Sequence, residues 1–231
     1  MTDASRVEEC TIAVGEDAVS GLLLRPPDAR GLLVLAHGAG AGMRHPFLDQ
    51  LSRALAAHGV ATLRYQFPYM EKRQARPDAP ALAGATVRAA CERARAEAPG
   101  LTLVAGGKSF GGRMTSTAQA EAPIPGVRGL VFVGFPLHPP KRPATPRAEH
   151  LARVHLPMLF LQGTRDDLAD LELMRGVTGR LAPLATLHVV EGADHSFAVL
   201  KRSGRTGAEV MAELAATTAA WIERLPRGGA G

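Results

Sequence analysis

The chain has 231 residues, of which 46% are hydrophobic and 21% charged, and a net charge of +5 at pH 7. These proportions are those of a globular protein and exclude a disordered body for the chain. The basic residues are scattered, aromatic residues make up only 4%, and no basic run is interleaved with aromatics, so we expect no nucleic-acid partner.

Short apolar runs alternate with longer amphipathic stretches along the chain, which is the pattern of a parallel sheet covered by helices. Several runs, such as Leu32–Ala36, are apolar throughout, as is typical of strands buried on both faces. The first two candidates are more mixed, and we expect them to form an antiparallel edge. The predicted strands are Thr11–Val14, Val19–Arg25, Gly31–Ala36, Val60–Arg64, Leu101–Ala105, Gly129–Val133, Met158–Gln162 and Ala185–Val190.

Helices are predicted between these strands at Pro46–His58, Gly84–Ala98 and Ser109–Glu121, and another from Arg147. A last helix begins at the capping-box pair Thr206 and Glu209. Its apolar positions, which we expect to face the core, are Val210, Leu214, Trp221 and Leu225.

We therefore predict a single three-layer α/β domain over residues 1–225, with a mostly parallel central sheet of about seven to eight strands, followed by a flexible tail over residues 226–231. The connection between Val133 and Met158 is about 24 residues long, which is too short for a cap domain. We expect an open site without a lid.

Cysteine usage and the amino-terminal sequence indicate the compartment. Cys10 and Cys91 lie in neither a CxxC motif nor a metal-ligand spacing, which suits a reducing cytosol. The first ten residues lack the basic and apolar regions of a signal peptide, and no apolar run approaches the ~20 residues that span a bilayer. We expect a cytoplasmic protein without a membrane partner.

The strongest motif is Gly107-Lys108-Ser109-Phe110-Gly111, which follows a predicted strand directly and precedes a predicted helix. In that context G-x-S-x-G indicates a nucleophile elbow, a turn so sharp that side chains at 107 and 111 would collide with neighbouring elements. A glycine-rich helix cap is one alternative. A phosphate-binding loop is another, because Gly107-Lys108-Ser109 reads G-K-S, but Thr102 stands where that loop needs its first glycine.

A serine hydroxyl needs a base to act as a nucleophile near neutral pH. His195, in a loop after the last predicted strand, is the candidate among eight histidines. Asp166, after the strand Met158–Gln162, is the candidate acid that orients the base. Asp167 remains an alternative, and either aspartate could instead cap a helix. Five other histidines are expected at surface or packing positions: His45, His58, His150, His155 and His188.

Acyl transfer also needs N–H donors that stabilise the oxyanion of the tetrahedral intermediate. The amide of Phe110 is one candidate, and the small-residue loop after residue 36 supplies a second, Ala39 or in second place Gly40. That loop could also be a flexible turn, but its G-x-G-x-G spacing is not the dinucleotide fingerprint. We expect His37, Gly40 and His138 to line the pocket.

These motifs resemble the α/β-hydrolase superfamily over nearly the whole chain, and the order Ser109, Asp166, His195 is the order of that superfamily. Three segments resemble more narrowly a small lidless branch near the dienelactone hydrolases, which includes hydrolase-like proteins related to a subunit of a histone-acetylation complex. These segments are Arg64–Tyr69, Gly107–Arg113 and Phe135–Pro140. Dienelactone hydrolases use a cysteine nucleophile, whereas this chain has Ser109, so their reaction is not carried over.

The sequence as a whole predicts a serine hydrolase that cleaves ester or thioester bonds of small acyl substrates, with no metal and no organic cofactor. The partner would be a small-molecule acyl substrate, and the oligomeric state stays open. Because some relatives in the branch are non-enzymatic scaffolds, a binding protein with the same fold is the alternative.

Overall fold

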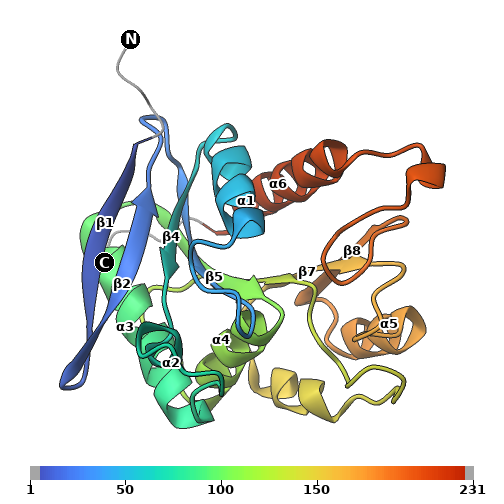
Figure 1. Cartoon of the computed structure of the whole chain (residues 1–231), viewed down its shortest axis with the longest axis horizontal. Coiled ribbons are helices and arrows are strands. Elements are labelled where there is room, and N and C mark those ends of the chain that lie inside the picture. Colours follow the sequence, from blue (N-terminus) through green and yellow to red (C-terminus); the bar gives the residue numbers. More distant parts are fainter. Residues whose placement is uncertain (1–5, 227–231) are drawn as a thin grey trace.

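The computed structural model describes residues 6–226, in which eight strands form one sheet (Figure 1). Its order is β1-β2-β4-β3-β5-β6-β7-β8. Apart from Pro226, the tail expected over residues 226–231 lies outside the described residues. The strands are β1 (Val7–Val14), β2 (Asp17–Leu24), β3 (Gly31–Ala36), β4 (Val60–Tyr65), β5 (Thr102–Lys108), β6 (Leu130–Val133), β7 (Met158–Gly163) and β8 (Ala185–Val190).

The sheet is parallel from β4 through β8, whereas β1 pairs antiparallel with β2 and β2 antiparallel with β4. The predicted antiparallel edge is therefore confirmed. Because parallel strands all end at the same edge, the loops that follow β3, β5, β7 and β8 meet there. This edge is where the sequence places every candidate site residue.

Helices cover both faces of the sheet (Figure 1). The α-helices are α1 (Pro46–Ala56), α2 (Pro68–Glu71), α3 (Pro80–Glu97), α4 (Phe110–Glu121), α5 (Leu171–Arg180) and α6 (Gly207–Glu223). Two short 3-10 helices, η1 (Pro146–Arg153) and η2 (Lys201–Ser203), complete the described elements.

Alternate side chains of β3 enter two separate hydrophobic cores. Leu33 and Leu35 join the core formed with α1 and α6, in which Leu214 of α6 is fully buried. Leu32 and Val34 join the other core, which α3, α4 and α5 cover. Since successive strand residues point to opposite faces, a strand buried on both sides must be apolar throughout. Full burial of one such leucine stabilises the fold by roughly 1.5–3 kcal/mol.

The predicted helices after β3, β5 and β8 are present, and α6 begins at the predicted capping box of Thr206 and Glu209. The main differences lie elsewhere. Helix α3 begins at Pro80 rather than Gly84, and β5 runs to Lys108 because its ladder with β6 continues through the glycines. The segment from Arg147 is a 3-10 helix. Helices α2 and α5 were not predicted, since α2 is a single turn and α5 contains two glycines, which are poor helix formers.

The connection between β6 and β7 holds η1 and extended segments, so within residues 6–226 no cap domain is inserted into the sheet. None of the helices in this part of the chain has the length and apolar character to cross a membrane.

Candidate active site

The turn from β5 into α4 holds Ser109 in a strained backbone conformation, with φ at +51° and ψ at −116°. The two flanking glycines make that turn possible. A methyl group on Gly107 would lie 2.5 Å from the carbonyl oxygen of Ala36, and one on Gly111 would lie 2.6 Å from that of His37. Any larger residue would push β5 and α4 away from β3, as expected for a nucleophile elbow.

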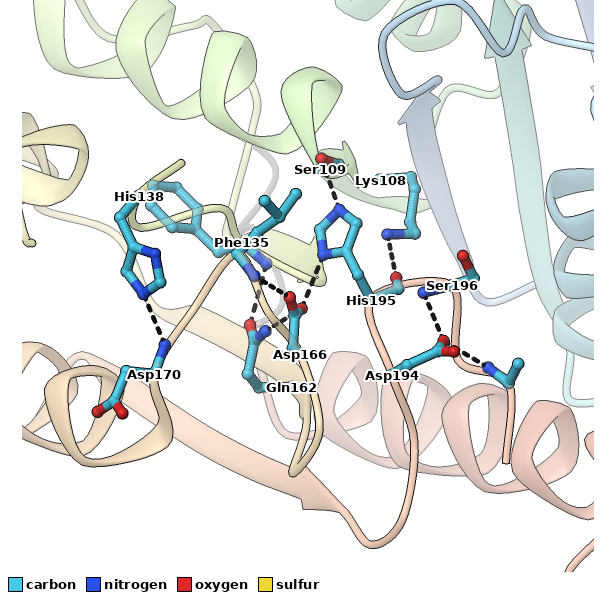
Figure 2. Close-up of polar contacts among 12 residues, drawn as sticks. Lys108, Ser109, Phe135, His138, Gln162, Asp166, Asp170, Asp194, His195 and Ser196 are labelled. Carbon is cyan, nitrogen blue, oxygen red and sulfur yellow. Dashed lines mark hydrogen bonds and ion pairs between the residues drawn. The ribbon is translucent and has the colours of Figure 1, made fainter. Parts of the chain in front are cut away.

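Three side chains from three loops form a continuous hydrogen-bonded chain at this edge (Figure 2). The Nε2 atom of His195 lies 2.9 Å from Oγ of Ser109, and its Nδ1 atom lies 2.7 Å from Oδ2 of Asp166. An ionised carboxylate can only accept, so Nδ1 carries the proton and Nε2 is free to accept the serine proton. These contacts join the three residues that the sequence predicts to be nucleophile, base and orienting acid.

Asp166, rather than Asp167, contacts the imidazole, and its side chain is fully buried. Its Oδ1 atom accepts from the amide of Leu168 at 2.8 Å, and its Oδ2 atom also accepts from Nε2 of Gln162 at 2.5 Å. Sequence reasoning missed Gln162. Its amide oxygen accepts from the Phe135 amide at 3.0 Å, so Gln162 bridges the carboxylate and the loop after β6.

The two proposed oxyanion donors are free to bind a substrate. The amides of Ala39 and Phe110 have no hydrogen-bond acceptor among residues 6–226. For Phe110 this follows from its place at the start of α4, where helix N–H groups lack intrahelical partners. The amide of Gly40, the second choice for this role, instead donates to the hydroxyl of Tyr69 at 2.8 Å. Tyr69 is a second residue that sequence reasoning missed.

A cavity of about 360 Å³ opens beside Ser109. It is lined by Gly38, Ala39, Ala41, His45, Phe47, Leu48, Lys108, Ser109, Leu168, His195 and Ser196. Of these residues, only Ala39, Ser109 and His195 are among the predicted site residues, and Lys108 and His45 are ionisable residues that were not predicted to line the cavity.

The expected pocket residues His37, Gly40 and His138 are not among the lining. His37 is fully buried, where its Nδ1 donates to the carbonyl of Gly38 at 2.7 Å and its Nε2 accepts from the Phe67 amide at 3.1 Å. Burial lowers the pKa of His37 to about 4, so its ring is a neutral link between two loops.

His138 makes the same kind of link. Its Nδ1 atom donates to the carbonyl of Pro139 at 2.9 Å, and its Nε2 atom accepts from the amide of Asp170 at 2.9 Å. Figure 2 shows its ring turned toward Asp170. His37, Gly40 and His138 are all close to the site in the sequence. The imidazoles of His37 and His138 instead form hydrogen bonds with backbone groups that need partners.

A second serine–histidine contact joins Ser116 to His150, with 2.7 Å between Oγ and Nε2. Ser116 is fully buried inside α4, its hydroxyl also lies 3.0 Å from the carbonyl of Arg113, and no carboxylate bonds to His150 among the described residues. Burial and two neighbouring arginines lower the pKa of His150 to about 4. We interpret this pair as a packing contact. Within residues 6–226 no group of three or more metal-ligating side chains converges.

A family model described as an alpha/beta hydrolase domain matches residues 29–223, which is most of the chain. The chain belongs to the α/β-hydrolase family. The match spans the elbow, both partner loops and the whole parallel part of the sheet. The predicted fold and superfamily are therefore confirmed.

Several solved structures have the same fold as this α/β hydrolase. A dienelactone hydrolase from Anabaena variabilis is 22% identical with a TM-score of 0.75, and the alignment covers 97% of this chain and 100% of that one. A serine hydrolase without a lid from Xanthomonas campestris is 21% identical with a TM-score of 0.72, covering 97% of each chain.

A serine hydrolase homologue from Coxiella burnetii is 20% identical with a TM-score of 0.71, covering 94% of this chain and 98% of that one. At such identities these structures establish the fold alone. The narrower resemblance to the histone-acetylation subunit relatives stays a prediction.

Proposed function

We propose that the chain is a serine hydrolase that cleaves ester or thioester bonds of small acyl substrates through an acyl-enzyme, with Ser109 as nucleophile, His195 as base and Asp166 as orienting acid. The observation that carries the proposal is the pair of contacts on one imidazole, 2.9 Å from Ser109 and 2.7 Å from Asp166. A scaffold with this fold has no need of three aligned groups drawn from three separate loops.

In the proposed first half-reaction, Nε2 of His195 takes the proton from Ser109 as Oγ attacks the acyl carbonyl carbon. The negative charge that develops on the carbonyl oxygen is stabilised by the amides of Ala39 and Phe110 and by the amino-terminal end of α4. The imidazolium then gives its proton to the leaving alcohol or thiol, and the carbon–oxygen or carbon–sulfur bond breaks.

In the second half-reaction, water takes the place of the leaving group. His195 accepts a proton from the water, which attacks the ester carbon of the acyl-enzyme. The proton returns to Oγ of Ser109 as the acid product leaves. Asp166 stays ionised throughout and stabilises the imidazolium.

The proposed substrate size follows from the cavity. A volume of about 360 Å³, walled by Phe47, Leu48 and Leu168, suits a short acyl chain. The absence of a cap within residues 6–226 leaves the serine accessible from solvent. Long-chain lipids and folded protein substrates are therefore less suitable than small esters or thioesters.

The test is hydrolysis of p-nitrophenyl acetate and butyrate, together with labelling by a fluorophosphonate probe, on wild type and two variants. Ser109→Ala should lower kcat by about 10⁴-fold or more and abolish labelling. Ser116→Ala is the matched control, because it removes the serine of the other serine–histidine contact, and it should retain activity and labelling.

If folded wild type neither turns over the esters nor reacts with the probe, the scaffold reading replaces the proposed function. If Ser116→Ala loses labelling while Ser109→Ala keeps it, the nucleophile is wrongly assigned.

A further inference from the structure

Lys108 stands immediately before the proposed nucleophile and reaches the loop that carries the proposed base (Figure 2). It is the last residue of β5, it is half-buried, and it lines the cavity beside Ser109. Its Nζ donates to the main-chain carbonyl oxygen of His195 at 2.6 Å. Residues 108 and 109 thus both bond to residue 195, one to its backbone and the other to its ring.

The amine of Lys108 lies against the loops that follow β6 and β8. The amine and the imidazole of His195 both lie close to Gly134. A methyl group on Gly134 would be 3.1 Å from Nζ of Lys108 and 3.5 Å from Cε1 and Nδ1 of His195. The ring centroid of Phe197 lies 5.5 Å from Nζ, within the range of a cation–π contact. Phe197 itself has φ at +64°, an unusual conformation that belongs to the tight turn around His195.

No carboxylate forms an ion pair with Lys108 among the described residues. The two nearby acids are already engaged, since Asp166 accepts from His195 and Gln162, and Asp194 accepts from the amides of Ser196 and Ala198. Their charges favour the ammonium only from a distance. A desolvated cation without a direct counter-ion is costly, and a polar surface residue at position 108 would avoid that cost.

We propose that Lys108 is a positioning residue, whose bond to the backbone of residue 195 holds the imidazole in line between Ser109 and Asp166. The inference rests on the serine-hydrolase function proposed above. Through this bond, the end of β5 positions both the proposed nucleophile and the loop that carries its base. The spacing between Oγ and Nε2 is then set by two adjacent residues, the last of β5 and the one that follows it, rather than by the loop alone.

A pH dependence follows from this geometry. The charged amine makes a stronger hydrogen bond to a carbonyl than the neutral amine does. Burial lowers the pKa of Lys108 to about 8, against the opposing influence of Asp166 and Asp194. Two further titratable side chains, His195 and His45, line the same cavity as Lys108. As the pH rises through about 8, Lys108 loses its proton, the bond weakens and kcat should fall.

The experiment measures kcat and KM for p-nitrophenyl butyrate from pH 6 to pH 10 in wild type, Lys108→Met, Lys108→Arg and Lys201→Met. Lys108→Met should have a kcat about ten-fold lower at pH 7, a KM within about two-fold of wild type, and no further fall above pH 8. Lys108→Arg keeps a charged donor and should recover part of the rate and move the alkaline fall to higher pH. Lys201→Met is the matched control in an exposed helix and should behave as wild type.

A second readout does not depend on catalysis. Hydrogen exchange of the amides of Asp194 and Phe197, which bond within the loop at 3.0 and 2.9 Å, should be about ten-fold faster in Lys108→Met and unchanged in Lys201→Met. Should Lys108→Met fail to fold, Lys108→Leu, which also lacks a donor, takes its place in both measurements.

Wild-type kcat with an unchanged alkaline fall in Lys108→Met would overturn the inference, as would a change confined to KM, which would make Lys108 a substrate-binding residue. If wild type itself is inactive toward esters and the probe, the proposed function fails separately. The exchange rates of the loop then decide whether Lys108 holds it, and unchanged rates would refute that role.

Discussion

Tyr69 illustrates how a single hydroxyl can determine the geometry of a site that it does not touch. Its oxygen accepts from the Gly40 amide, which follows Ala39 in the chain, and its own amide donates to Asp78 at 3.1 Å. Burial raises the pKa of Tyr69, so the hydroxyl is neutral at any working pH. The bond fixes the peptide next to the proposed oxyanion donor, Ala39, which lines the cavity and whose amide has no acceptor among the described residues.

We expect Tyr69→Phe to lower kcat for p-nitrophenyl butyrate by about ten-fold, or about 1.4 kcal/mol, with little change in KM, because a lost partner for a backbone N–H costs about 1–3 kcal/mol. The chain offers a matched control, Tyr65→Phe. The Tyr65 hydroxyl is buried and accepts no backbone N–H among the described residues, so its removal should leave kcat unchanged. Equal effects of the two substitutions would contradict the role of Tyr69.

At the scale of elements, the elbow depends on the closeness of three units: β3, β5 and the start of α4. Gly111 lies where the first turn of α4 passes the end of β3, and a methyl group there would meet backbone atoms of both Ala36 and His37. Backbone cannot move aside as a flexible side chain can. The position of Ser109 above the sheet is therefore coupled to the packing of a whole helix.

We expect Gly111→Ala to lower the free energy of unfolding by about 2 kcal/mol or more, because overpacking typically costs 1–3 kcal/mol. Gly179→Ala in α5 is the control, since a methyl group there meets nothing within 4 Å. That change should raise the free energy of unfolding, by up to about 1 kcal/mol, through helix propensity. Urea denaturation monitored by circular dichroism measures both, and a neutral Gly111→Ala would show that β3 and α4 are not in close contact.

At the scale of the whole molecule, buried neutral histidines make stability depend on pH. The pKa of His37 is lowered to about 4 by burial, and that of His150 is also lowered to about 4 by burial and by Arg113 and Arg153. In the unfolded chain both would titrate near 6.5. Between these values the unfolded state binds more protons, so stability is fully present above pH 6.5 and is lost as the pH falls toward 4.

For His37, acidification from pH 7 to pH 5 should cost about 2 kcal/mol of unfolding free energy. His37→Gln, which keeps one donor and one acceptor, should flatten the stability profile by about that amount, although it starts from a lower stability at pH 7. His58→Gln, at an exposed position, should leave the slope unchanged. Urea unfolding at pH 5, 6 and 7 tests this, and parallel profiles for wild type and His37→Gln would refute it.

The elements that the sequence predicted well are those whose signal is local. The bounds of β3, a continuous apolar run, and those of β8 are as predicted, and the capping box marks the start of α6. The last residues of β5 escaped prediction because Gly106 and Gly107 carry no side chain, and only their ladders with β3 and β6 make them part of a strand. Likewise α2 is one turn long, and its Tyr69 is recognisable only from the contact that it makes.

The amino-acid order by itself determined the fold class, the elbow at Ser109 and the candidate partners Asp166 and His195, because strand periodicity, glycine requirements and loop position are properties of short segments. Only the tertiary structure decided between Asp166 and Asp167, removed His37 and His138 from the pocket, and introduced Gln162, Tyr69 and Lys108. Each of those decisions concerns which buried donor meets which acceptor across the sheet edge. Most of these partners are tens of residues apart in the chain, so no local pattern encodes the distance between them.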